Sequence, residues 1–301
     1  MRLNALTIDV EDYFQVNAFA RHIGREQWDG YPLRVEANTR RILDMLDEFQ
    51  VKATFFVLGW VAERVPTLVR QIHGRGHEIA CHGYGHELVY VIGPDAFRRD
   101  IRKAKEILED IIGEKVRGYR APSYSITRQS LWALDILIEE GFCYDSSIFP
   151  VYHDTYGIPD APRFPHVITR QSGSIAEFPL TTYPLKCGSR EYRLPIAGGG
   201  YLRLFPAHLL RRCIAAINER ENQPAVLYFH PWEIDPDQPR IKAGFKSRFR
   251  HYLNLNSTEG KLRHIIGNAR FGTMESVLRT VEQNSENKIS SVLRVRMVEG
   301  R

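Results

Sequence analysis

The feature that most constrains the fold is a regular alternation of short apolar segments with amphipathic helical patterns in the first 150 residues. One helical face, for example, carries Ile42, Met45, Leu46 and Phe49 at helical spacing. Apolar strand patterns cover residues 3–9, 52–59, 77–83, 116–122 and 142–149, and helical patterns cover 38–49, 65–76, 94–113 and 128–141. Alternation at this spacing predicts an α/β fold with a parallel sheet, either open or closed into a barrel.

The alternation of strand and helix patterns ends after Pro150. Residues 151–200 are rich in Pro, Gly and Tyr and predict loops with short strands, before a helix over 206–220 and an apolar strand over 225–230. From Pro236 the chain becomes basic and irregular. We therefore expect a catalytic domain over residues 1–235, an extension over 236–285 packed on it, and a tail over 286–301 that is either an edge strand or disordered.

Composition and charge exclude several classes of protein. Acidic residues follow the first few apolar ones, so the amino terminus resembles neither a signal peptide nor a membrane span. Four scattered cysteines show no disulfide density and no CxxC spacing. These features predict a cytoplasmic protein. A formal net charge of +5 is too small to indicate a nucleic-acid partner.

Polar residues follow the strand patterns at equivalent positions. In a parallel α/β fold, ligands bind where the carboxyl ends of the strands open. The residues at those ends are a carboxylate pair, two histidines, an arginine, a further acid and a third histidine: Asp9 and Glu11, His82 and His86, Arg120, Asp145, and His230. Such a set favours a single site rather than unrelated surface groups.

Metal-assisted hydrolysis is the chemistry that uses this set. Two imidazoles and one carboxylate form a three-ligand site that leaves positions open for water and substrate. Zn²⁺ in such a site lowers the pKa of a water molecule to about 7. A second carboxylate can accept the proton of that water, and a histidine can donate one to the leaving group.

Five ordered motifs carry a family resemblance. "TIDVED", "HGYGH", "RAPSY", "YDSS" and "LYFH" resemble, in this order, the motifs of the polysaccharide deacetylases (carbohydrate esterase family four, NodB-homology domain). The resemblance covers roughly residues 3–235 and implies a distorted (β/α) barrel. "DVEDYFQV", "GGGYLRLFP" and "HPWEIDPDQPR" resemble a branch that has a carboxyl-terminal extension and is associated with bacterial exopolysaccharide loci of the PEP-CTERM/exosortase kind.

The resemblance also implies roles for individual residues. It implies Asp9 as general base, His230 as general acid, and His82 and His86 as metal ligands. Arg120 would hold the base, and Asp145 would tune or orient His230.

Two positions depart from the usual motifs of the family. Val10 stands where the family has a ligand aspartate, so we expect Glu11 to be the carboxylate ligand, with Asp12 as the alternative. Ser123 precedes Tyr124 in the third motif, and we expect a backbone N–H at Ser123 to bind the oxyanion and Tyr124 to form the aromatic wall.

The expected reaction is removal of N-acetyl groups from hexosamines of a polysaccharide or its precursor, with one divalent ion, Zn²⁺ with Co²⁺ or Ni²⁺ as alternatives. Two other functions stay open: hydrolysis of another C–N bond, such as a cyclic imide or ureide, and glycan binding without catalysis. The basic segment over residues 240–251 interleaves Phe245 and Phe249 with cations. This pattern is compatible with a solvated face, or with weak peripheral membrane association and a lipid-linked oligosaccharide substrate.

Overall fold

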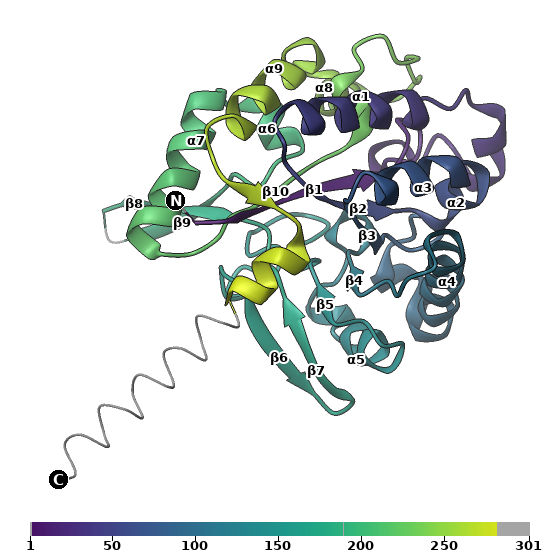
Figure 1. The fold of residues 1–301 in the computed structure, drawn as a ribbon, viewed down its shortest axis with the longest axis horizontal. Helices are drawn as coiled ribbons and strands as arrows, with labels where there is room; N and C mark the ends of the chain where they lie inside the picture. The colour runs from purple at the N-terminus through teal and green to yellow at the C-terminus, as the bar shows by residue number, and fades with distance from the viewer. Residues whose placement is uncertain (1, 189, 282–301) are drawn as a thin grey trace.

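A mostly parallel sheet forms the centre of the molecule (Figure 1). The computed structural model describes residues 2–188 and 190–281. The strand order is β10-β1-β2-β3-β4-β5-β7-β6, with β11 also paired to β1, and the β6–β7 pair is antiparallel. The strands of this sheet are β1 (Asn4–Val10), β2 (Thr54–Val57), β3 (Glu78–Cys81), β4 (Gly118–Tyr119), β5 (Tyr144–Asp145), β6 (His166–Arg170), β7 (Gly173–Glu177), β10 (Val226–Phe229) and β11 (Phe271–Gly272). The predicted α/β fold with a parallel sheet is confirmed.

Helices cover the outside of this sheet, and each of the first three strands leads into the helical segment that follows it (Figure 1). Apolar residues of α1, including Ile42, Met45 and Leu46, are buried in the core as their spacing predicts. The helices are α1 (Val35–Glu48), α2 (Gly59–Arg64), α3 (Pro66–Gly74), α4 (Val89–Ile112), α5 (Trp132–Glu139), α6 (Gly200–Leu204), α7 (Ala207–Ala216), α8 (Phe245–Tyr252) and α9 (Leu255–Ile266).

Two helices begin earlier than their sequence patterns predict. The pattern of α4 begins at Pro94, but the helical segment begins at Val89 and bends at Gly93, which has a φ of 74°. A φ in this region is easily adopted by glycine, and proline removes a backbone donor, so the pair marks the bend. The other helix that begins early is α1, which starts at Val35 rather than at Asn38.

The glycines before α6 allow two backbones to meet. Gly198 forms a parallel bridge to Tyr228 of β10 and has a φ of 141°. A Cβ atom at Gly198 would lie 1.7 Å from the Tyr228 carbonyl oxygen. Only glycine fits this position, which brings α6 against the end of β10. A separate hairpin, β8 (Thr182–Cys187) with β9 (Arg190–Pro195), precedes this turn.

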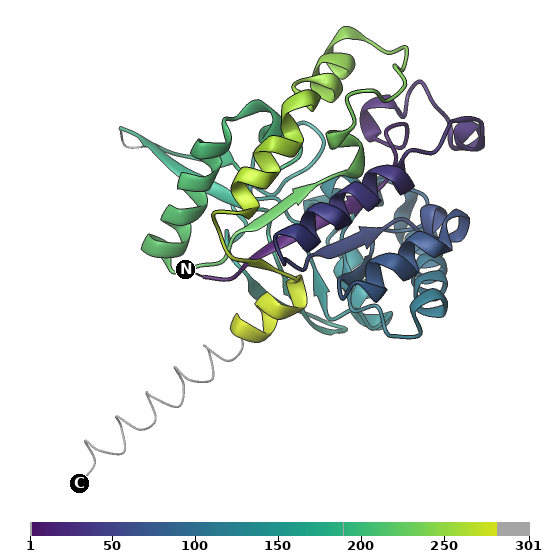
Figure 2. The ribbon, with the colours of Figure 1, turned by 45° about the horizontal axis from the view of Figure 1, so that its top comes forward.

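The segment after residue 235 packs on the rest of the chain. Figures 1 and 2 show α9 lying between α1 and α7, and ion pairs from Arg41 to Glu259 and from Arg263 to Glu48 join α9 to α1. Strand β11 then pairs with β1. The division at residue 235 stays a prediction, and the predicted tail over 286–301 lies outside the described residues.

Candidate metal and hydrolase site

The carboxyl ends of β1, β3, β4 and β10 bring six of the predicted side chains together. Asp9 and Glu11 leave β1, His82 and His86 follow β3, Arg120 follows β4, and His230 follows β10. Parallel neighbours place these ends at one edge of the sheet. The site is therefore built where the strand-end rule predicts it.

Glu11, His82 and His86 form a group able to hold a metal ion. Their ligand atoms all lie within 4.8 Å of one another. Oε2 of Glu11 lies 2.7 Å from Nε2 of His86, yet among the described residues this buried oxygen accepts no well-aligned hydrogen bond. A buried carboxylate oxygen without such a donor is rare, and a cation between these groups would satisfy it. The residues fit a divalent ion.

The charge states of these groups also suit a metal. Burial lowers the pKa of His82 to about 4, so this imidazole is neutral at pH 7 and keeps a lone pair. Nδ1 of His82 lies 2.8 Å from the Arg120 carbonyl and donates to it, which leaves Nε2 as the ligand atom. Burial alone would raise the pKa of Glu11, but the charges of His86 and His230 hold it at about 2.

The turn between the two histidines is held by α4. Backbone N–H groups of Tyr84 and Gly85 donate to the Asp100 carboxylate at 2.8 and 3.1 Å. Gly83 has a φ of 72°, and a Cβ atom there would lie 2.7 Å from Asp100 Oδ2. The glycine-rich spacing of "HGYGH" thus lets the chain wrap around one carboxylate and present His86, itself at a φ of 53°.

Asp9 is held by a buried arginine. Arg120 Nη1 donates to Asp9 Oδ1 at 2.6 Å and to Thr7 Oγ1 at 2.8 Å, and Arg120 is fully buried. Ser146 fixes the other side of the guanidinium through its carbonyl and its hydroxyl. Arg120 therefore forms a buried ion pair with Asp9, and the second oxygen of Asp9 faces His230, 3.9 Å from its Nε2.

His230 is oriented by Glu233, which the sequence reasoning did not single out. Nδ1 of His230 lies 3.0 Å from Glu233 Oε2, and its Nε2 lies 3.6 Å from Glu11 Oε1. Burial would lower the pKa of His230, but Glu11, Glu233 and Asp9 raise it to about 9. Burial would raise the pKa of Glu233, but Arg203 and His230 hold it at about 2, so Glu233 accepts the Nδ1 proton.

The structure corrects the expected partner of His230. The carboxylate of Asp145 contacts the hydroxyl and backbone N–H of Ser147, and it shares a side-chain hydrogen bond with Glu177 of β7. No contact between Asp145 and His230 is present among the described residues. Asp145 ends β5, which four strands separate from β10 in the sheet order, whereas Glu233 lies three residues after His230 on the same turn.

Asp12 lies beside the group but is fully engaged with backbone. Its carboxylate accepts from the N–H groups of Tyr13, Arg34 and Val35 at 2.9, 2.7 and 2.9 Å. It therefore caps the amino terminus of α1, which explains why this helix begins before Asn38. Of the two candidate carboxylates, Glu11 is the one whose oxygens face the histidines.

The third motif forms a strained turn, η3 (Pro122–Tyr124), beside Arg120. Ser123 and Tyr124 have φ values of 52° and 54°. The Tyr124 N–H donates to the Ala121 carbonyl, while no hydrogen bond among the described residues uses the Ser123 N–H. The Tyr124 ring is buried against Tyr228 and Phe149. The expected donor at Ser123 is thus free, whereas Tyr124 is part of the packed core.

A cleft of about 370 Å³ adjoins His86. Trp28, Arg25 and Val91 contribute to its walls, so it combines apolar and charged surface. A larger cavity of about 650 Å³ lies around Glu78, Arg117 and Glu275. Glu78 begins β3, so this cavity lies at the opposite edge of the sheet from the metal-ligand group. Of these two cavities, the smaller is the one lined by a residue of the metal-ligand group, His86.

Two family models match this chain, one after the other. Residues 28–137, which include His82, His86 and Arg120, match the polysaccharide deacetylase model. Residues 146–279, which include His230 and Glu233, match a domain of unknown function (DUF3473). Asp9 and Glu11 precede both matched ranges.

Several curated relatives are named as deacetylases. The peptidoglycan-N-acetylglucosamine deacetylase of Bacillus cereus is 39% identical over 98 residues, which cover 32% of this chain and 36% of that protein. A chitooligosaccharide deacetylase of Sinorhizobium fredii is 34% identical over 100 residues, 33% of this chain and 44% of that one. The matched segment thus spans less than half the length of either relative.

Solved structures share the fold over nearly the whole chain. A candidate polysaccharide deacetylase of Mycobacterium smegmatis has a TM-score of 0.59 at 24% identity and covers 94% of this chain and 91% of its own. Another, from Pseudomonas aeruginosa PAO1, has a TM-score of 0.57 at 15% identity, with 92% and 89% covered. At these identities the likeness shows the fold, and it confirms the predicted NodB type.

Proposed function

Since this chain belongs to the polysaccharide deacetylase family, we propose that it is a metal-dependent hydrolase that removes N-acetyl groups from hexosamine residues of a glycan. One observation carries the proposal: Glu11, His82 and His86 converge within 4.8 Å, beside a carboxylate held by arginine and a histidine held by a carboxylate. A divalent ion held by these three residues would polarise a water molecule and the acetamide carbonyl.

The protein side chains would move the protons. Asp9 accepts a proton from the attacking water as the new C–O bond forms, and Arg120 keeps Asp9 ionised by proximity of charge. The free N–H of Ser123 is a candidate donor to the oxyanion. The C–N bond then breaks as His230 gives a proton from Nε2 to the leaving nitrogen. The products are acetate and a free amine on the sugar.

The proposal also includes the metal ion, the biological role and the cellular location. Zn²⁺ is the proposed ion because an open three-ligand site with two imidazoles and a carboxylate suits it. A role in bacterial exopolysaccharide synthesis is implied by the sequence resemblance, whereas a cytoplasmic location is predicted from the apolar segments and the scattered cysteines; both stay predictions. No helix among the described residues is both long and apolar enough to cross a membrane.

A screen of acetate release from acetylated sugars, coupled to metal analysis of the same samples, tests the function. The expected result is one divalent ion per chain and acetate release from N-acetylated chito-oligomers, both lost in His82→Ala. Bound metal with hydrolysis of a cyclic imide or ureide and none of the chito-oligomers would redirect the proposal to another C–N bond. Glycan binding without metal or hydrolysis would leave a binding protein.

A further inference from the structure

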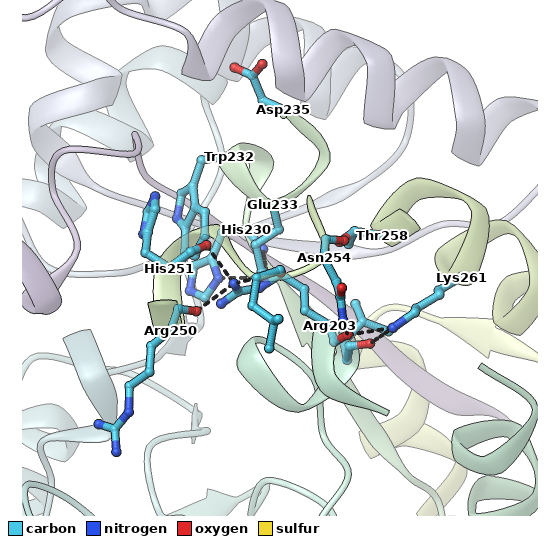
Figure 3. Close-up of polar contacts among 12 residues, drawn as sticks. Arg203, His230, Trp232, Glu233, Asp235, Arg250, His251, Asn254, Thr258 and Lys261 are labelled. Atoms are coloured by element: carbon cyan, nitrogen blue, oxygen red, sulfur yellow. Dashed lines mark hydrogen bonds and ion pairs between the residues drawn. The ribbon is translucent and has the colours of Figure 1, made fainter. Parts of the chain in front are cut away.

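We infer that Glu233 and Arg203 are positioning residues for His230, and that the end of α8 in the carboxyl-terminal extension completes their arrangement. The inference rests on the proposed function, in which His230 protonates the leaving nitrogen. It adds a part of the site that lies outside the five motifs and assigns a purpose to the extension (Figure 3).

Glu233 contacts His230 twice. Its Oε2 accepts from the backbone N–H of His230 and from the ring Nδ1–H, each at 3.0 Å. Glu233 lies on the turn η6 (Pro231–Ile234) and is fully buried. These two bonds fix both the main chain and the ring of His230, so its Nε2 faces Asp9 and Glu11. A proton on Nε2 is then the one that can move.

Arg203 secures the other oxygen of Glu233. Its Nε donates to Glu233 Oε1 at 2.6 Å, and the arginine is itself buried. A buried carboxylate needs such a partner because isolated charges are costly inside a protein. Arg203 lies on α6, which the Gly198 turn holds against β10, the strand that leads into His230.

The end of α8 supplies carbonyl partners for the Arg203 guanidinium. Nη1 donates to the carbonyls of Arg250 and His251 at 2.7 and 2.6 Å, with Leu253 more distant at 3.4 Å. Carbonyls at a helix carboxyl terminus carry partial negative charge and favour a cation. In Figure 3 the Arg250 side chain points away from the cluster, so the backbone of α8, and not its side chains, makes this contact.

Two side chains of the extension hold the α6 backbone in turn. Asn254 Nδ2 donates to the Arg203 carbonyl at 3.0 Å, and Lys261 Nζ donates to the same carbonyl at 2.6 Å. Lys261 also reaches the carbonyl of Phe205. Residues 250–261 thus contact Arg203 through both its guanidinium and its main chain, which locks its direction toward Glu233.

Trp232, on the same turn as Glu233, makes a second contact between the extension and the site. Its indole lies between two imidazoles, stacked on His251 of α8 at 4.1 Å and on His230 at 5.1 Å between ring centres. Its Nε1 donates to Glu11 Oε1 at 3.2 Å. The extension therefore supports both His230 and the Glu11 carboxylate through the turn η6. Removing the extension would misplace both side chains.

The test compares two substrates in the metal-loaded, full-length protein. An N-acetylated chito-oligomer needs a proton on its leaving amine, whereas 4-nitrophenyl acetate releases a stable phenolate that needs none. Glu233→Gln keeps the size of the side chain and should lower kcat on the oligomer by ~10- to 100-fold, the usual effect of losing an orienting partner. Its kcat on the ester, its KM for the oligomer and its metal content should change little.

Variants at Arg203 separate positioning from folding. Arg203→Met leaves Oε1 of Glu233 buried without its arginine donor and can unfold, so the Arg203→Met/Glu233→Gln pair, which removes both charges, is measured beside it. Arg203→Met and the double variant should show the same loss of kcat, on the oligomer and not on the ester. Arg203→Lys should keep part of the kcat that Arg203→Met loses. Arg263→Gln, which removes surface ion pairs of α9 in the same extension, is the matched control and should keep both activities.

Comparing Asp145→Asn with Glu233→Gln decides which of the two acids orients His230. If Asp145→Asn lowers the oligomer-to-ester ratio and Glu233→Gln does not, Asp145 orients His230 and the inference is wrong. Equal losses on both substrates in Glu233→Gln would also overturn it. If the unaltered protein releases no acetate, the proposed function fails, and ¹⁵N-histidine NMR then tests positioning alone: a hydrogen-bonded His230 Nδ1–H signal should be present and should be lost or shifted in Glu233→Gln.

Discussion

At the scale of single residues, two adjacent acids have different tasks. Glu11 and Asp12 are both buried, and the sequence allows either as the metal ligand. Glu11 faces His82 and His86, whereas Asp12 binds three backbone N–H groups around the start of α1. Side-chain direction separates them, because neighbouring residues leave the chain on different sides.

The first prediction separates these acids by variants. Glu11→Ala should abolish bound metal and activity because it removes the one anionic ligand, as His82→Ala should by removing a nitrogen ligand. Asp12→Ala should keep the metal but lower the free energy of unfolding by about 1 to 2 kcal/mol, as for a lost helix cap. Metal analysis and thermal melts check both. Metal lost from Asp12→Ala alone would move the ligand to Asp12.

The second prediction concerns the base. Asp9→Asn should keep the metal and lower kcat by ~10²–10⁴, because the amide cannot accept the proton of water. Because the substitution also removes the charge that Arg120 Nη1 contacts at 2.6 Å, a thermal melt is needed beside the kinetics. A folded, metal-loaded Asp9→Asn with near-normal turnover would make Asp9 a structural residue.

At the scale of elements, α8 presents two faces. Its carboxyl-terminal carbonyls point to Arg203, while Phe245 and Phe249 are 84% and 55% exposed and stack on each other. Lys246, Arg248 and Arg250 are exposed around them. An aromatic pair surrounded by cations suits an anionic, lipid-linked glycan, although exposed cations are also common on solvated helices.

The third prediction tests this exposed face. Replacing Lys242, Lys246, Arg248 and Arg250 by Ser should weaken binding to anionic vesicles, since each cation contributes about 1 kcal/mol near such a surface. KM should rise on an anionic or lipid-linked substrate and stay unchanged on a neutral chito-oligomer. Arg70→Ser/Arg99→Ser, which removes exposed cations of α3 and α4, is the control. Absence of vesicle binding at low salt, or equal loss on both substrates, would leave a solvated face.

At the scale of the whole molecule, a buried acid pair joins β5 to β7. Burial raises the pKa of Asp145 to about 6 and that of Glu177 well above its usual range. Glu177 Oε1 also accepts from the Ile148 N–H at 3.1 Å. The folded protein therefore holds a proton at this pair that the unfolded chain would have released near pH 4.

The fourth prediction follows from this proton. A group whose folded pKa exceeds its unfolded pKa stabilises the fold at low pH, and this contribution is lost as pH rises through the folded pKa. The contribution of Asp145 to the free energy of unfolding should therefore fall between pH 4 and about 6, with that of Glu177 falling at higher pH. Glu177→Gln keeps a hydrogen-bond donor for Asp145. It should reduce the fall of the free energy of unfolding at the high-pH end of the profile. Urea denaturation from pH 5 to 9 checks this, and identical pH profiles for both proteins would contradict it.

The sequence by itself determined the parallel α/β fold and the place of the site. Strand and helix periods are local properties, and the carboxyl ends of parallel strands meet at one edge, so Asp9, His82, His86, Arg120 and His230 could be expected together. Local patterns also predicted α3 and the first strands to within a few residues.

Only the tertiary structure decided which partners these residues take. Asp12 caps α1 across 22 residues, Arg203 contacts α8 across more than 40, and Trp232 reaches Glu11 across 221. Such contacts depend on how distant segments pack, which no period along the chain encodes. For the same reason Asp145, placed by motif order, pairs with Glu177 instead of His230, because the position of β5 in the sheet determines what that side chain can reach.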